Sequence, residues 1–131
     1  YADVARYMAA ADVLLMPWNS GEWIQNCNPV KTKEYLATGR PVVSTPYPEL
    51  EPYTDHVLVA DNAEAFAAAI RHAIAFPDQA PNTAAERRAL VAVQTWDAKA
   101  DNLLRELAML GVVVAPSGIP TPRLGARPLE A

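Results

Sequence analysis

The stretch NPVKTKEYLATGRPVVSTP, residues 28–46, decides the fold of this 131-residue chain. Asn28 and Pro29 predict a helix start, because asparagine accepts hydrogen bonds from free amides and proline suits the first helical position. Gly39 predicts the end of that helix, since glycine adopts the left-handed conformation without strain. Residues 41–44 are mostly apolar and predict a buried strand directly afterwards. The stretch thus indicates a helix that leads into a strand.

Helices and short apolar runs alternate on both sides of this stretch. We expect strands at 13–17, 41–44 and 56–60, and helices at 2–10, 28–38 and 62–76, from Thr83 onward and from Thr95 to Gly111. Asp61 or Asn62 is expected to cap the helix at 62–76, and Thr83 with Glu86 predicts a capping box. Continuous apolar strands separated by helices are typical of a parallel sheet covered on both faces. We therefore expect an α/β fold, a partial Rossmann-like parallel sheet with flanking helices. Three strands make a small sheet, so we expect earlier strands in a longer protein.

Two irregular segments and a tail complete the predicted organisation. Residues 18–27 have no clear period and are expected to form a loop, and residues 47–54 a proline-punctuated loop or one helical turn. Residues 1–111 form the predicted domain. Residues 112–131 contain four prolines without a period, and they predict a disordered tail.

Composition limits the classes of function. The chain is 51% hydrophobic and 20% charged, as in ordinary globular proteins. Its net charge of −4 argues against nucleic acid as a partner. A single cysteine, Cys27, excludes an internal disulfide and suits a reducing compartment. No group of His, Cys, Asp and Glu has metal-ligand spacing, so we expect neither a metal nor a cofactor.

Lys31 and Glu34 are the candidate site residues. Ligands of parallel sheets bind at the carboxyl ends of the strands, and the helix from Asn28 should start there. With Pro29 as the first helical residue, Lys31 is the third, where a cation loses roughly 0.3–1 kcal/mol against the helix dipole. A bound anion would offset this loss. Glu34 follows on the same face, and its carboxylate can accept two hydrogen bonds from a ribose diol.

Phosphate and sugar contacts one helical turn apart describe a nucleotide, but a second interpretation stays open. Lys31 and Glu34 are also common surface residues, and as a solvated pair they would contribute little. The helix start, the Gly39 stop and the buried strand favour the site over the surface pair.

Other residues in distinctive positions have plainer interpretations. Trp18 and Trp23 flank the 18–27 loop and could line a cleft, although anchoring of the loop is favoured. Trp96 shares a helical period with leucines, which predicts packing. Asp55 and His56 precede a strand, at the end where chemistry is not expected. Cys27 has no basic neighbour to make it a nucleophile.

The 28–46 stretch resembles the donor-binding segment of GT-B glycosyltransferases, in the group 1 type of retaining enzymes that use nucleotide sugars. The shared pattern is a proline, a lysine, Glu-Tyr-Leu-Ala, a glycine and Pro-Val-Val. The segments YADVARYMAAADVLLMPW, HVLVADNAEAFAAAI and TWDAKADNLLREL resemble neighbouring elements of the same domain. The resemblance covers roughly residues 1–110 and implies the later part of the C-terminal, donor-binding domain of such an enzyme.

The resemblance implies roles for individual residues. Glu34 would bind the ribose hydroxyls of the donor, and Asn28, Pro29, Val30 and Lys31 would lie against its diphosphate. Many members carry an earlier glutamate that reads the transferred sugar, and Asn26 stands at that position. Glu22 lies in the same loop at a different spacing, so Asn26 or a backbone amide would take over that contact.

The implied reaction transfers a sugar from a nucleoside diphosphate sugar to the hydroxyl of an acceptor glycan, with retention and without a metal. The glycine-rich loop, further basic residues and the acceptor domain are absent from this sequence, so we expect that it does not catalyse alone. We expect a cytoplasmic protein, whether or not the parent rests on the inner face of the membrane. Two alternatives stay open: a non-catalytic or degenerate α/β nucleotide-binding or interaction module, and a plain scaffold.

Overall fold

The computed structural model describes residues 3–112 of the chain. Its elements follow one another as α1 (Val4–Ala10), β1 (Leu14–Met16), α2 (Glu22–Gln25), α3 (Val30–Thr38), β2 (Val42–Ser44), the 3-10 helix η1 (Pro48–His56), β3 (Leu58–Val59), α4 (Ala63–Ala75), α5 (Ala84–Ala92) and α6 (Trp96–Met109). This order confirms the predicted α/β fold. The predicted tail at 112–131 lies outside the described residues, apart from its first residue.

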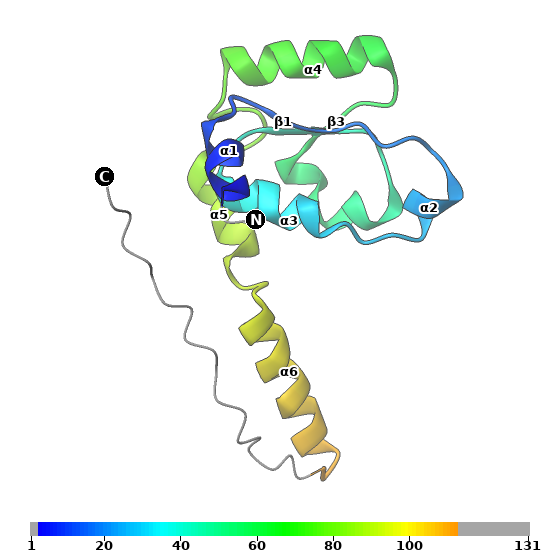
Figure 1. The fold of residues 1–131 in the computed structure, drawn as a ribbon, viewed down its shortest axis with the longest axis vertical. Coiled ribbons are helices and arrows are strands. Elements are labelled where there is room, and N and C mark those ends of the chain that lie inside the picture. Colours follow the sequence, from blue (N-terminus) through cyan, green and yellow to red (C-terminus); the bar gives the residue numbers. More distant parts are fainter. Residues whose placement is uncertain (1–2, 113–131) are drawn as a thin grey trace.

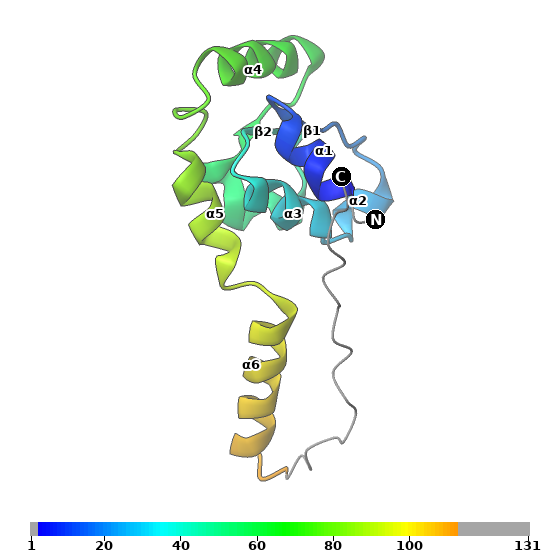
Figure 2. The same ribbon diagram turned by 60° about the vertical axis from the view of Figure 1, so that its left-hand side comes forward.

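The three strands form one parallel sheet in the order β1-β2-β3. Leu14 pairs with Val42, and Val43 pairs with Leu58. Figures 1 and 2 show α4 on one face of the sheet, with α3 and α5 on the other. The connections run through helices, as parallel strands require. The result is a small Rossmann-like layer structure.

Consecutive residues of β2 supply the cores on the two faces. Val42 packs with Leu36 of α3, Leu50 of η1 and other apolar side chains on one face. Val43 packs on the other face with Ala73 of α4. Both valines are fully buried, as expected for a central strand whose side chains alternate between two covered faces.

A buried arginine joins α5 to the end of α3. The Arg87 guanidinium donates hydrogen bonds to the Gly39 carbonyl (Nε 3.0 Å, Nη2 2.9 Å) and to the carbonyls of Pro77 and Pro81 at 2.9 Å. Only 1% of Arg87 is exposed, and this burial lowers the pKa of its guanidinium. Gly39 has φ 77°, which confirms the predicted left-handed helix end. Arg87 thereby holds the carboxyl end of α3 against the linker that precedes α5.

Predicted caps and helix boundaries agree with the structure in α4 and α5. Asn62 caps α4 by accepting a hydrogen bond from the Ala65 amide at 2.9 Å. Thr83 and Glu86 form the predicted capping box at the start of α5. Both are local interactions, which explains why the sequence alone predicts them.

Other predictions about secondary structure were wrong. The 18–27 loop contains α2, and the region after residue 47 is the nine-residue helix η1 instead of one turn. Because η1 reaches His56, β3 is shorter than the predicted strand at 56–60. The prediction that Trp96 packs was also wrong, since Trp96 is 80% exposed.

Helix α6 extends away from the rest of the described residues (Figures 1 and 2), and none of its residues is buried. Its leucines therefore do not contribute to either core. Among residues 3–112, no helix combines the length and the apolar character that crossing a membrane requires.

Candidate functional site

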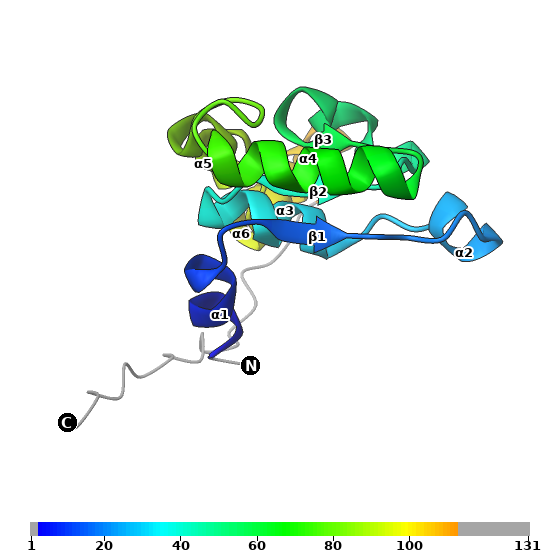
Figure 3. The same ribbon diagram turned by 90° about the horizontal axis from the view of Figure 1, so that it is seen from above.

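The start of α3 lies at the carboxyl edge of the sheet. Seen from above in Figure 3, β1 points toward the segment that carries α2, and the chain then returns into α3. The amino end of α3 therefore faces the region where ligands bind in parallel α/β sheets. Among the described residues, no side chain caps this end of α3. Its dipole and backbone amides favour an anion there.

The predicted start of this helix was wrong by one residue. Pro29 has ψ 120° and occupies the capping position, so Val30 is the first helical residue and Lys31 the second. Asn28 does not cap the helix. Its side chain donates to Glu49 Oε2 at 2.8 Å and accepts from Lys33 Nζ at 2.9 Å. A residue before Pro29 is restricted to extended conformations, and tertiary neighbours decide where its side chain binds.

Lys31 and Glu34 meet on one face of α3, as their spacing predicted. Lys31 Nζ lies 2.6 Å from Glu34 Oε2, and the two side chains are 39% and 25% exposed. A carboxylate beside Lys31 offsets the repulsion between the ammonium group and the helix dipole. The structure thus places one cation and one partly buried carboxylate at the helix end that faces the carboxyl edge of the sheet.

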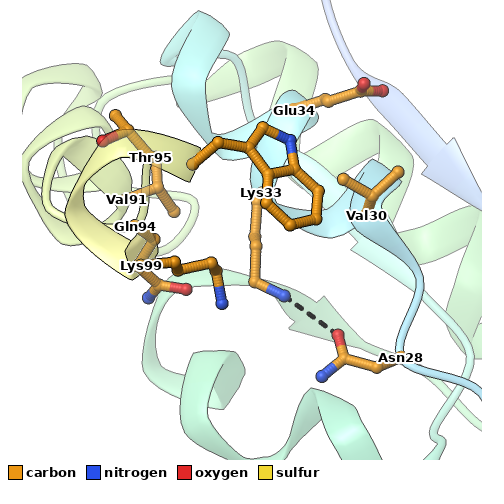
Figure 4. A pocket seen from close by; sticks show the side chains of 9 residues that line it. Asn28, Val30, Lys33, Glu34, Val91, Gln94, Thr95 and Lys99 are labelled. Carbon is orange, nitrogen blue, oxygen red and sulfur yellow. Dashed lines mark hydrogen bonds between the residues drawn. The ribbon is translucent and has the colours of Figure 1, made fainter. Parts of the chain in front are cut away.

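A cavity of about 430 Å³ adjoins this pair (Figure 4). Its lining comes from two distant parts of the chain: Asn28, Val30, Lys33 and Glu34 from the start of α3, and Val91, Gln94, Thr95, Trp96 and Lys99 from the α5–α6 region. Lys33, Trp96 and Lys99 were not predicted as site residues. No spacing in the sequence connects α3 with α6, so only the tertiary structure reveals this grouping.

The loop before α3 holds the remaining predicted residue, Asn26. Its side-chain amide donates to the Glu22 carbonyl at 2.9 Å, and the residue is exposed. The Trp18 and Trp23 rings lie 5.4 Å apart. Trp18 packs against the core, which agrees with the anchoring interpretation, whereas Trp23 is 63% exposed. The structure thus places Asn26 in the segment before α3, with its side-chain amide bound to the backbone of α2.

Several other polar residues have structural roles. Thr45 Oγ1 donates to the Trp18 carbonyl at 2.8 Å, so it links the loops that follow β2 and β1. Asp55 and His56 end η1 at the amino end of β3, away from the site. Cys27 is half-buried and packs against the core. Within residues 3–112, no group of His, Cys, Asp and Glu could hold a metal ion.

Comparison with known proteins identifies the family. Residues 1–75 match the family model described as Glycosyl transferases group 1, which is more than half of the chain and includes the whole candidate site on α3. No curated protein and no solved structure matched the chain. The match agrees with the three-stranded parallel sheet and its helices. The chain therefore belongs to the family of group 1 glycosyl transferases.

Proposed function

We propose that this chain binds the nucleotide of the donor in a retaining glycosyltransferase of the GT-B type. The enzyme would transfer a sugar from a nucleoside diphosphate sugar to an acceptor hydroxyl. The observation that carries the proposal is the pair formed by Lys31 and Glu34, which lies in contact at the start of α3. The family match supports glycosyl transfer in general.

The diphosphate and the ribose of a nucleotide would contact different groups at the start of α3. The diphosphate would lie against the segment from Asn28 to Lys31, where backbone amides and the helix dipole favour negative charge. The Lys31 ammonium would add a cation there. The Glu34 carboxylate would accept hydrogen bonds from both ribose hydroxyls. This arrangement uses the carboxylate and the ammonium group together, which agrees with their 2.6 Å contact.

The site would act on the leaving group by electrostatics. Negative charge grows on the diphosphate as the sugar departs, and fixed amides and an ammonium group stabilise that charge without a metal or another cofactor. Asn26 or a backbone amide of its loop would contact the transferred sugar. The residues of this chain thus orient the donor and stabilise the departing diphosphate.

The remaining parts of the enzyme would come from a longer parent protein. These parts are an acceptor domain, a glycine-rich loop and further basic residues. The acceptor would be a saccharide, lipid-linked or small, as in the synthesis of bacterial polysaccharides or glycoconjugates. The protein would work in the cytoplasm, and the acceptor domain would make any contact with the membrane. The 131 residues alone would then bind donor but not catalyse.

A second candidate function is a non-catalytic nucleotide-binding or interaction module. Asn26 favours it, because this residue replaces the earlier glutamate of the family pattern and its amide nitrogen already binds the Glu22 carbonyl. Nucleotide binding by Glu34 without sugar transfer by the parent protein is the outcome expected from that alternative.

Titration of the parent protein with uridine and guanosine diphosphates tests the proposal. We expect Glu34→Ala to weaken binding of the preferred nucleotide about tenfold or more, because hydrogen bonds to a charged group contribute about 1.5–3 kcal/mol. The matched control is Glu64→Ala, which removes an exposed glutamate of α4. Equal affinities of both variants and the wild type would contradict the proposal. A transfer assay with radiolabelled sugar then separates the enzyme from the non-catalytic module.

A further inference from the structure

The cavity between α3 and α6 contains a second pair of cations. Lys33 belongs to α3 and Lys99 to α6, and both line the cavity. Figure 4 shows their ammonium groups turned toward the same part of it. Lys33 Nζ donates to Asn28 Oδ1 and lies 5.9 Å from the centre of the Tyr53 ring. Among the residues that the structure describes, Lys33 forms no ion pair with a carboxylate.

Lys99 likewise forms no ion pair among the described residues. Within the described part of the chain, the ion pairs are Arg6 with Asp3 and Lys31 with Glu34, so neither Lys33 nor Lys99 belongs to one. Two like charges that share a cavity repel each other, and an anion between them removes that repulsion. Glu34 also lines the cavity, but Figure 4 shows its carboxylate turned away from the two ammonium groups. The part of the cavity near the two lysines thus has the charge that suits a phosphate group.

The same cavity is lined by an exposed indole. Trp96, the first residue of α6, is 80% exposed. Tryptophan presents a large flat face, on which sugar or base rings stack, and a polar N–H at its edge. The cavity volume of about 430 Å³ lies near the lower end of the range of small-molecule pockets, about 300–1,000 Å³. This size suits one ring with one phosphate.

We propose that this cavity binds a phosphate attached to a ring, with the phosphate between Lys33 and Lys99 and the ring against Trp96. A sugar phosphate and a mononucleotide share this chemistry. The cavity adjoins the proposed donor contacts, because Asn28, Val30 and Glu34 also line it. Its phosphate would lie on Lys33 and Lys99, whereas the donor diphosphate would lie on Lys31. The proposed site gives the exposed aromatic side chain at the start of α6 a function that packing does not supply.

The inference is tested with the indole N–H resonances of the ¹⁵N-labelled chain. Trp96→Phe assigns the Trp96 signal, and the chain is titrated with glucose 1-phosphate, uridine monophosphate and inorganic phosphate. We expect the Trp96 signal to shift with at least one of the two ring phosphates, and this phosphate to bind more tightly than inorganic phosphate. The two ring phosphates distinguish a sugar site from a nucleotide site. No shift with either, or equal affinity for inorganic phosphate, overturns the inference.

Charge reversal provides the second measurement. Lys99→Glu is expected to weaken binding of the ring phosphate about tenfold or more, because it replaces a charge-assisted hydrogen bond with repulsion. The matched control Arg105→Glu makes the same charge change on the exposed part of α6, outside this cavity. Both positions are exposed, so both variants should keep the fold, and circular dichroism verifies this. Equal weakening by the two variants would show general attraction of anions and overturn the proposed site.

Discussion

Arg87→Ala should be the most destabilising substitution of a charged residue among the described residues. Arg87 is 1% exposed and supplies hydrogen bonds to the carbonyls of Gly39, Pro77 and Pro81. It also donates to the Asn82 carbonyl. Removal of the guanidinium leaves these carbonyls without their donor and opens a cavity beside the end of α3.

The expected loss of folding free energy follows from the buried carbonyls that Arg87→Ala leaves without a hydrogen-bond donor. A buried acceptor without a partner costs about 1–3 kcal/mol, and several are affected. Part of this cost is recovered, since the charge no longer has to be buried and water can enter. We expect a net loss of about 3–5 kcal/mol, against a total stability of about 5–15 kcal/mol for a typical domain.

Arg88→Ala is the matched control, because Arg88 is the next residue and is exposed. Its Nη2 donates to the Thr38 carbonyl at 2.8 Å. Loss of this single hydrogen bond should cost about 0.5–1.5 kcal/mol.

Urea denaturation followed by far-ultraviolet circular dichroism separates the two arginine variants. A loss of about 4 kcal/mol lowers the urea midpoint by about 2 M when the slope is about 2 kcal/mol/M. Arg88→Ala should lower it by well under 1 M on the same scale, at about 0.25–0.75 M. Equal midpoints for Arg87→Ala and Arg88→Ala would refute the argument that Arg87 holds the end of α3 in place.

Two further predictions concern local structure. Gly39→Ala should destabilise the chain by about 1–2 kcal/mol in urea denaturation, because φ 77° is left-handed and the added carbon would meet the Arg88 guanidinium; an unchanged midpoint would contradict this. Hydrogen bonds from the Thr83 backbone amide and hydroxyl hold the pKa of the Glu86 carboxyl below its ordinary value of 4.5. The stabilisation by Glu86 is therefore complete above pH 4.5 and is lost as the pH falls through the lowered pKa. The stability difference between the wild type and Glu86→Gln should shrink in that acid range, and a difference independent of pH would refute the assignment.

The candidate site was predictable where it depends on one helix. Lys31 and Glu34 are three residues apart, and helical geometry places such residues side by side. Their contact at 2.6 Å follows from that spacing. The role of Asn28 was not predictable, because its side chain binds Glu49, which is remote in sequence. Asparagine before a helix has several partners within reach, and the fold selects one of them.

The sequence by itself determined the features that depend on near neighbours in the chain. These are the apolar strands, the helix end at Gly39, the capping box at Thr83 and the pairing of Lys31 with Glu34. Each depends on backbone geometry or on residues within one helical turn. This local information was sufficient for the α/β class.

Only the tertiary structure decided which distant groups meet. It placed Arg87 against the carbonyl of Gly39, and it brought Lys99 of α6 to the same cavity as Lys33 of α3. It also left Trp96 exposed, although the helical period of that residue predicted packing. Periodicity shows that a helix has an apolar face, but whether another surface covers that face depends on where the helix lies in three dimensions.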